Sequence, residues 1–491
     1  MDRDLVKLIY SGLIKYDGAG HLVPDLAQTY TINAEQTSYT FELRPDLRWH
    51  DGQPLTADDV IFTINQIKNP DFGSPLRASL NGINAKKIND QTVQFVLEKP
   101  FAPFLSIMIL GLLPEHLWYS IPDFGAALAD LNIKPVGSGP YQFKSLTKDT
   151  NGHLKTYALE AYDDYHGGQP YIQELVFKFY PDFVTAITAL ENKNVDGLSF
   201  LPKEYKEQLK KTKISLHNLK LPQYTALYFN PKNNTLLENN DFRLALALAL
   251  DKARILSESI DDDGQLIAGP LLAGLPGYDP DLKGVDYKPE EAKKILEELG
   301  WKMTADQSFR QKAEGDKTKE LKIKLTTVDQ MENSRAASII KENWEAVGIK
   351  TELEIISKDR IKQNVIEPRQ YEVLLFSQLI NINAGSYAFW HSSQNQNPGL
   401  NLTVLANKDI DKYLEEYRQA ASEETKLNSL KNFQNKLIEL NFAIFLYNPS
   451  YSYPTSPDLR GLESLQFINL PADRFNTINS WYLKTKRVLS K

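Results

Sequence analysis

Strand-like and helix-like segments alternate along the chain, and this alternation restricts its fold more than any other feature. Residues 39–44 (YTFELR) put Tyr, Phe and Leu on one face and Thr, Glu and Arg on the other, which predicts a half-buried strand. Thr56 and Asp59 fit a capping box, so we expect a helix from about Ala57 to Ile67. No repeat with a period of about 20–50 residues is apparent, which argues against solenoids and propellers.

Later segments extend the same pattern. Pro289 fits a first helical position, apolar residues follow it with helical spacing, and Gly300 fits the position just after the helix. The other expected elements are strands at 92–97 and 175–180, a turn into a strand at 137–141, and helices at 183–192, from Asp241 onward and at 334–347. An edge-like strand follows, in which Ile349, Thr351, Leu353 and Ile355 alternate with Lys350, Glu352 and Glu354. The predicted fold class is mixed α/β, in at least two lobes.

Length and composition limit the classes of protein that the chain can form. Its 491 residues correspond to roughly three domain-sized units at about 150 residues each, or to two large ones. The net charge of −7 and the absence of a long basic run argue against a nucleic-acid partner. Cysteine is absent, which excludes disulfides and thiolate metal sites within the chain. The most apolar stretch, 104–113, is about half of the ~18 residues that a membrane-spanning helix needs.

No segment carries a recognisable catalytic or metal-binding motif. The seven histidines are never paired at the spacing of zinc hydrolases, and no serine stands in a nucleophile elbow. We interpret His50-Asp51 and the 163–166 segment as structural or solvated, and Asp261 to Gly264 as a turn rather than a calcium loop. The glycines at 137–141 have the wrong spacing for a phosphate cradle, which favours a plain turn. We therefore expect neither an enzyme nor a bound cofactor or metal.

Aromatic and amide side chains outside the periodic segments are the chain's unusual feature. The 377–394 segment combines Asn381, Asn383, Tyr387 and Trp390 with several hydroxyl groups and no net charge. Tyr and Trp offer a flat apolar body with one polar atom, which suits a small-molecule pocket. The alternative is an ordinary packed loop. The aromatic residues in question are Tyr224, Tyr228, Tyr387, Trp390, Tyr447, Tyr451 and Tyr453.

The order of several short motifs resembles one known family. The motifs are 8–13 (LIYSGL), 24–27 (PDLA), 41–44, 50–60 (HDGQPLTADDV), 137–141 (GSGPY), 241–243 (DFR), 250–251, 289–301 and 347–349. Together they look like the extracellular solute-binding proteins of family 5, the dipeptide- and oligopeptide-binding receptors of ABC importers.

The resemblance implies a two-lobed α/β clamshell of the periplasmic-binding-protein type, with an inserted subdomain in the first lobe. Residues 1–24, 137–223 and 465–491 would form lobe I, 25–136 the inserted subdomain, and 224–464 lobe II. It also implies an extracytoplasmic monomer that closes on a ligand and delivers it to an ABC permease and its ATPase. Because family members usually have a leader and further residues before the 8–13 motif, we expect a leader or membrane anchor to precede Met1.

The ligand implied by the resemblance is a peptide, but one position departs from the family pattern. Peptide receptors of this family commonly hold the ligand's α-ammonium with an Asp that would fall at about Asn381, and no Asp or Glu occurs between Phe376 and Ala406. We expect Asn381, Asn383, Tyr387, Trp390 and Tyr224 to bind the ligand, with Tyr387 and Trp390 as stacking surfaces. A longer or blocked peptide, a neutral oligosaccharide and a metal chelate remain alternatives, as do a sensing role and, last, a carboxylate hydrolase.

Overall fold

The structure is a computed structural model, and it describes most of the chain. The described residues are 2–74, 76–101, 103–202, 205–210, 212–303, 308–315, 317–380, 385–404, 406–420, 422–463, 465 and 468–484. The chain divides into two compact units: unit 1 comprises 1–220 and 451–491, and unit 2 comprises 221–450. The lobe boundaries expected at 223/224 and 464/465, and the assignment of 25–136 as an inserted subdomain, stay predictions.

A four-stranded antiparallel sheet with one covering helix forms the first part of unit 1. Its strand order is β3 (Ala27–Ile32), β4 (Ser38–Leu43), β6 (Thr92–Leu97) and β5 (Ile83–Asn89). Tyr39, Phe41 and Leu43 are buried and alternate with less buried residues, as the period of two predicted. Helix α2 (Ala57–Lys68) begins at the predicted capping box: Asp58 N donates to Thr56 Oγ1, and Thr56 N donates to Asp59 Oδ2.

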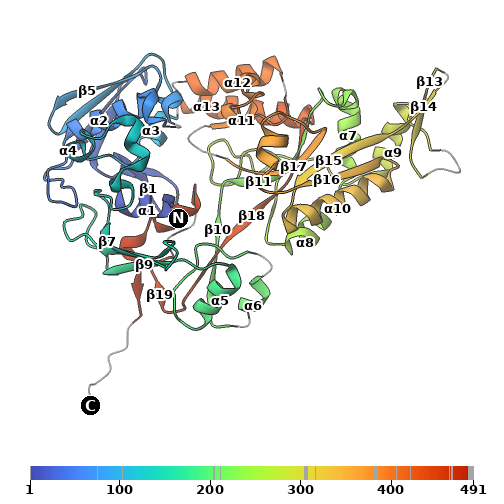
Figure 1. Cartoon of the computed structure of the whole chain (residues 1–491). Coiled ribbons are helices and arrows are strands. Elements are labelled where there is room, and N and C mark those ends of the chain that lie inside the picture. Colours follow the sequence, from blue (N-terminus) through green and yellow to red (C-terminus); the bar gives the residue numbers. More distant parts are fainter. Residues whose placement is uncertain are drawn as a thin grey trace. The chain divides into compact units, whose positions relative to one another are not determined.

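The rest of unit 1 is built on a three-stranded antiparallel sheet of β7 (Tyr141–Lys148), β8 (Leu154–Ala161) and β9 (Glu174–Lys178). Helix α1 (Asp2–Ile9) packs near β7 and near the returning C-terminal segment (Figure 1). There Arg474 forms a buried two-bond ion pair with Asp4, and Trp481 packs on Phe475 and Tyr453. The smaller elements are β1 (Ile14–Tyr16), β2 (Leu22–Pro24), α3 (Phe104–Ile107), α4 (Glu115–Trp118), α5 (Phe183–Glu191), α6 (Lys206–Lys210), β10 (Ser215–Lys220), β19 (Leu459–Arg460) and β20 (Tyr482–Leu483).

Unit 2 is organised around a mixed sheet that is most deeply buried along its central strands. The order is β18 (Ala443–Thr455, whose last residues belong to unit 1), β11 (Gln223–Phe229), β17 (Val373–Leu379), β15 (Lys322–Val328) and β16 (Lys350–Ile356), with β12 (Gly264–Leu266) pairing β18. Leu227 and Phe229 join a core with α7 (Asn240–Leu248), α8 (Lys252–Ile260), α9 (Pro289–Glu298) and α10 (Met331–Ala346). A short hairpin, β13 (Gln311–Glu314) and β14 (Lys317–Glu320), follows α9 in the chain.

The opposite face of this sheet carries Tyr224 and Tyr228, since adjacent strand residues point to opposite sides. It is covered by α11 (Gly385–Trp390) and α13 (Glu423–Glu439), which contribute Trp390 and Phe433. Helix α12 (Lys408–Gln419) packs on both α11 and α13, and the three helices are drawn in orange above β11 and β17 in Figure 1.

Helices α9 and α10 confirm the predicted ends. Gly300 and Gly348 both have left-handed φ values, +86° and +87°, directly after the helix caps. Helix α10 begins at Met331, three residues before the predicted start. Strand β16 lies at the edge of the sheet, as the sequence predicted, and Ile355 near its end is 47% exposed.

Candidate functional site

The described members of the predicted ligand-binding set, Tyr387, Trp390 and Tyr224, all lie in unit 2. Tyr387 and Trp390 stand on α11, and Tyr224 stands on β11. Asn381 and Asn383 lie outside the described residues. The 377–394 segment lies outside the periodic segments of the sequence, yet α11 spans Gly385–Trp390 within it, because a helix of six residues is too short to produce a recognisable period.

Trp390 and Tyr224 belong to one buried aromatic cluster. The Trp390 ring lies 5.7 Å from that of Phe445 and 6.4 Å from that of Tyr228, and Tyr224 meets Phe445 edge to face at 5.3 Å. Trp390 is 2% exposed and Tyr224 is 1% exposed, and burial raises the pKa of the Tyr224 hydroxyl. The cluster therefore anchors α11 to the sheet.

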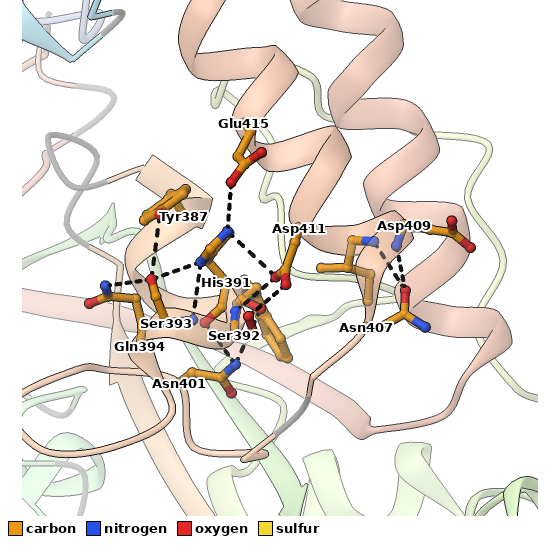
Figure 2. Close-up of polar contacts among 12 residues, drawn as sticks. Tyr387, His391, Ser392, Ser393, Gln394, Asn401, Asn407, Asp409, Asp411 and Glu415 are labelled. Atoms are coloured by element: carbon orange, nitrogen blue, oxygen red, sulfur yellow. Dashed lines mark hydrogen bonds and ion pairs between the residues drawn. The ribbon is translucent and has the colours of Figure 1, made fainter.

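Tyr387 lies between the His391 ring and the Arg418 guanidinium. The His391 ring stacks on it at 4.1 Å with an interplanar angle of 16°, and the Arg418 guanidinium lies 4.2 Å from its centroid. Because two groups this close cannot share one face, both faces of the Tyr387 ring are covered. Its hydroxyl points toward Ser393 Oγ at 3.4 Å (Figure 2). A ligand could stack on Tyr387 only after Arg418 moved aside, and the ligand-contacting roles of Tyr387, Trp390 and Tyr224 stay predictions.

His391 connects Tyr387 to helix α12. Ser393 N donates to His391 Nδ1 at 3.1 Å, so Nδ1 is an acceptor and the ring proton of the neutral histidine is on Nε2. His391 Nε2 lies 3.4 Å from Glu415 Oε1 and 3.7 Å from Asp411 Oδ1, as Figure 2 shows. The ring is 7% exposed and therefore fixed in orientation.

Asp411 holds the start of the segment after α11. Its two carboxylate oxygens accept from Ser392 N at 2.8 Å and from Ser392 Oγ at 2.6 Å. Asp411, Glu415 and Arg418 all face α11 from α12, at the i, i+4, i+7 spacing of one helix face. None of the three was predicted from the sequence. Their i, i+4, i+7 spacing is visible there, but no neighbouring residue indicates that they contact a segment about 20 residues earlier.

Other residues considered in the sequence serve the scaffold of unit 1 or unit 2. His50 Nε2 donates to Gly139 O at 3.0 Å and His50 Nδ1 accepts from Gly137 N at 3.2 Å, so this ring holds the 137–141 turn. His166 Nε2 lies 2.9 Å from Asp25 Oδ1. The Asp261–Gly264 segment in unit 2 is a turn into β12, with Asp261 and Asp262 at left-handed φ.

The site in unit 2 presents hydroxyls, an imidazole and aromatic rings. Behind them lie two carboxylates, of which Asp411 accepts hydrogen bonds from Ser392 and Glu415 lies 3.4 Å from His391 Nε2. Within the ranges that the structure describes, no group of three or more His, Asp or Glu side chains is placed to hold a metal ion. Ser393 Oγ lies 2.8 Å from His391 Nδ1, in a short exposed turn that His391 caps by accepting from Ser393 N, so this pair takes part in the hydrogen bonding of the turn.

Comparison with known proteins identifies the class. The profile of the bacterial extracellular solute-binding proteins, family 5, matches residues 21–399, and the chain belongs to this family. The oligopeptide-binding protein AppA of Bacillus subtilis is 25% identical over 98% of this chain and 87% of its own length. The dipeptide-binding protein of Escherichia coli is 24% identical over 84% of this chain and 81% of its own length.

Solved structures show the same fold. AppA of Bacillus subtilis in complex with a nonapeptide superposes with a TM-score of 0.77 at 24% identity, covering 98% of this chain and 94% of AppA. NikZ of Campylobacter jejuni in complex with Ni(L-His) superposes with a TM-score of 0.79 at 24% identity, covering 97% and 94%. At this identity the similarity establishes the two-lobed binding-protein fold and leaves the ligand open. The chain is thus a family 5 solute-binding protein. Among the residues that the structure places, no helix is both long and apolar enough to cross a membrane.

Proposed function

We propose that this chain captures peptides outside the cytoplasm and delivers them to an ABC permease and its ATPase. The observation that carries the proposal is the family match over 21–399 together with nearly full-length relatives named for oligopeptide and dipeptide binding. Capture would occur by closure of two lobes, in which the closed form is favoured by contacts that the ligand makes only there. We propose that the chain acts as a monomer, catalyses no reaction and needs no metal.

We further propose that Asn381, Asn383 and Tyr387 contact the ligand, with Trp390 and Tyr224 supporting them from the aromatic cluster. A neutral amide cannot give an ammonium group the charge-assisted bond that a carboxylate gives, which is about twice as strong as a neutral bond. A buried peptide N-terminus at Asn381 would lack a counter-charge, which is unfavourable. The site should therefore prefer longer peptides, or blocked ones, that run past this point.

The experiment compares the affinity for one peptide with a free and with an acetylated N-terminus, by calorimetry. We expect the wild type to bind the acetylated form at least as tightly as the free form, and Asn381→Asp to shift the preference toward the free amine by about tenfold. Asn364→Asp, an exposed position in unit 2, adds the same charge elsewhere and should leave the preference unchanged. Tighter binding of the free amine by wild type, with no gain in Asn381→Asp, would show that the α-ammonium is held elsewhere.

A second candidate ligand is a metal chelate, because NikZ shares the fold and was solved with Ni(L-His). Titrating the protein with Ni(L-His) distinguishes a chelate ligand from a peptide ligand. Submicromolar binding of the nickel complex without measurable peptide binding would favour it.

A further inference from the structure

Exposed apolar side chains adjoin one another in unit 1, at the start of helix α5. Phe183, Val184 and Phe200 are 42%, 59% and 40% exposed. The ring centroids of Phe183 and Phe200 lie 6.4 Å apart, and the two rings are close to perpendicular, at 77°. Exposed apolar residues that occur singly are ordinary, whereas a contiguous group marks a surface that contacts another molecule. We refer to Phe183, Val184 and Phe200 as the apolar patch.

Phe183 extends the apolar stripe of α5 beyond the core. Phe183, Ile187 and Leu190 stand at the i, i+4, i+7 spacing of one helix face. Ile187 and Leu190 are buried in a small core with Leu198 and Leu201, whereas Phe183, at the first helical position, is exposed. The stripe therefore continues from this core onto the surface of unit 1.

The backbone on both sides of Phe200 is bonded to strand β18. Leu198 N donates to Pro454 O and Leu201 N donates to Ser452 O, both at 3.1 Å. Leu198 and Leu201 are themselves buried in the core below α5. Phe200 is therefore presented on a short segment whose neighbours on either side are fixed.

Two further aromatic side chains support the patch. Tyr451 stacks on Phe200 with ring centroids 5.7 Å apart and an interplanar angle of 28°, and its hydroxyl donates to Ser199 O. The Tyr205 ring lies 6.5 Å from that of Phe183, at 31°. Because these contacts hold the rings of the patch, little conformational freedom is lost when another group packs on them.

The chemistry of the patch selects an apolar group. The side chains of Phe183, Val184 and Phe200 contain only carbon and hydrogen, so they offer no hydrogen-bond donor or acceptor. They can remove apolar surface from water and pack against another ring, either edge to face or offset. The group that fits best is therefore aromatic.

The size of the patch argues for a small occupant. A specific interface between two proteins uses about 20–30 residues on each side, far more than this patch provides. A single aromatic side chain, in contrast, can be covered by a few neighbouring apolar residues. A side chain of a small ligand thus matches the patch better than a second protein does.

The patch also adjoins a strand that connects the two units. Strand β18 spans Ala443–Thr455, and Tyr451 is the first residue of unit 1 after the chain leaves unit 2. In a protein that closes two lobes on its ligand, residues beside the connecting segments are well placed to contact that ligand.

We propose that the apolar patch is a subsite for one aromatic side chain of the captured peptide, an inference that rests on the proposed function. The ligand ring packs against Phe183 and Phe200, and Val184 borders it. The patch adds a preference for an aromatic residue and does not hold the peptide termini.

The test measures the binding of acetylated penta-alanine to the full chain by calorimetry, together with the peptides in which one alanine at a time is replaced by phenylalanine. We expect wild type to bind at least one phenylalanine peptide about tenfold more tightly than penta-alanine, because burial of an aromatic side chain is favourable to at least this extent.

Phe183→Ala and Phe200→Ala should each reduce this preference to about threefold or less, and leave the affinity for penta-alanine within about twofold of the wild-type value. Phe200→Tyr keeps the ring and should keep the preference. Since Phe183 is exposed at the start of its helix, Phe183→Ala should retain the wild-type melting temperature, and it decides the question if Phe200→Ala does not fold.

The control removes an exposed aromatic side chain elsewhere in unit 1. Tyr119 on α4 is 78% exposed and lies outside the patch, so Tyr119→Ala should show the wild-type preference for phenylalanine. Sedimentation velocity of wild type and Phe200→Ala tests the competing occupant, a second copy of the chain.

Three outcomes would overturn the proposal. In the first, peptides bind but no phenylalanine peptide binds more tightly than penta-alanine. In the second, the preference persists unchanged in both alanine variants of the patch. In the third, wild type forms a dimer at micromolar concentration and Phe200→Ala does not. Failure of every peptide to bind would instead contradict the proposed function, and this inference with it, so the two failures are distinguishable.

Discussion

His50 shows how the protonation of one side chain can make the stability of the fold depend on pH. Its ring bridges Gly137 and Gly139 in the neutral form, since Nδ1 must accept while Nε2 donates. Burial lowers the pKa of His50 from 6.5 to about 4, although the bond to Gly139 O works in the opposite direction. Between these values the unfolded chain binds a proton at this residue that the folded chain does not bind.

We therefore predict that the free energy of unfolding falls as the pH is lowered from about 6.5 to about 4, with a contribution from His50 of roughly 3 kcal/mol at most. His50→Gln should remove this contribution, and it is measured as the difference between variant and wild type in denaturant titrations at pH 7 and pH 4.5. His21→Gln, an exposed histidine, should retain the wild-type pH dependence. Identical pH dependence of wild type and His50→Gln would refute this role of the ring.

At the scale of elements, two buried arginines hold helix ends together. Arg310 Nε donates to Val347 O after α10 at 2.7 Å, and its Nη1 donates to Trp301 O after α9 at 2.9 Å. Arg243 donates to Leu440 O at the end of α13 and to Leu237 O. The last carbonyl groups of a helix have no donor within the helix and usually bind water. Both arginines are 2% exposed, so their guanidinium groups take the place of that water.

Gly348 gives a prediction at this scale because it combines a left-handed φ with close packing. Its φ is +87°, and a Cβ there would lie 2.7 Å from Arg310 Cγ, whose guanidinium is fixed by the bonds above. Gly52 has a similar φ of +84° but no atom within 4 Å of such a Cβ. Gly52→Ala should lower the free energy of unfolding by about 1 kcal/mol, and Gly348→Ala by about 2–4 kcal/mol, because only Gly348 adds overpacking.

Urea titration of both variants measures this difference. Equal losses would mean that Arg310 moves freely to make room, contrary to its bonds with Val347 and Trp301.

The elements that the sequence could predict were those specified by neighbouring residues. Thr56 with Asp59 and Pro289 with Gly300 lie within one or a few turns of each other, so local rules located α2 and α9. The contacts of Tyr387 could not be predicted in this way, because Arg418 comes from another helix about 30 residues later. The Asp241-Phe242-Arg243 motif pointed to the family, but only the structure shows that Arg243 holds Leu440.

At the scale of the whole molecule, the family and the fold followed from many short motifs in order, and the profile match confirms that prediction. The ligand could not be inferred in the same way. We expect it to depend on a few side chains, with Asn381 and Asn383 proposed among them, rather than on the scaffold motifs. Relatives with this fold are named for dipeptides, oligopeptides and a nickel–histidine complex.

The central claim is that this scaffold serves to bind peptides. The most direct measurement is native mass spectrometry of the purified chain mixed with peptides from dipeptides to nonapeptides, Ni(L-His) and a neutral oligosaccharide at equal concentration. Our account predicts one bound peptide per chain, with acetylated peptides retained at least as well as free ones. A chain that retains only Ni(L-His) or only the oligosaccharide, and no peptide of any length, would contradict it.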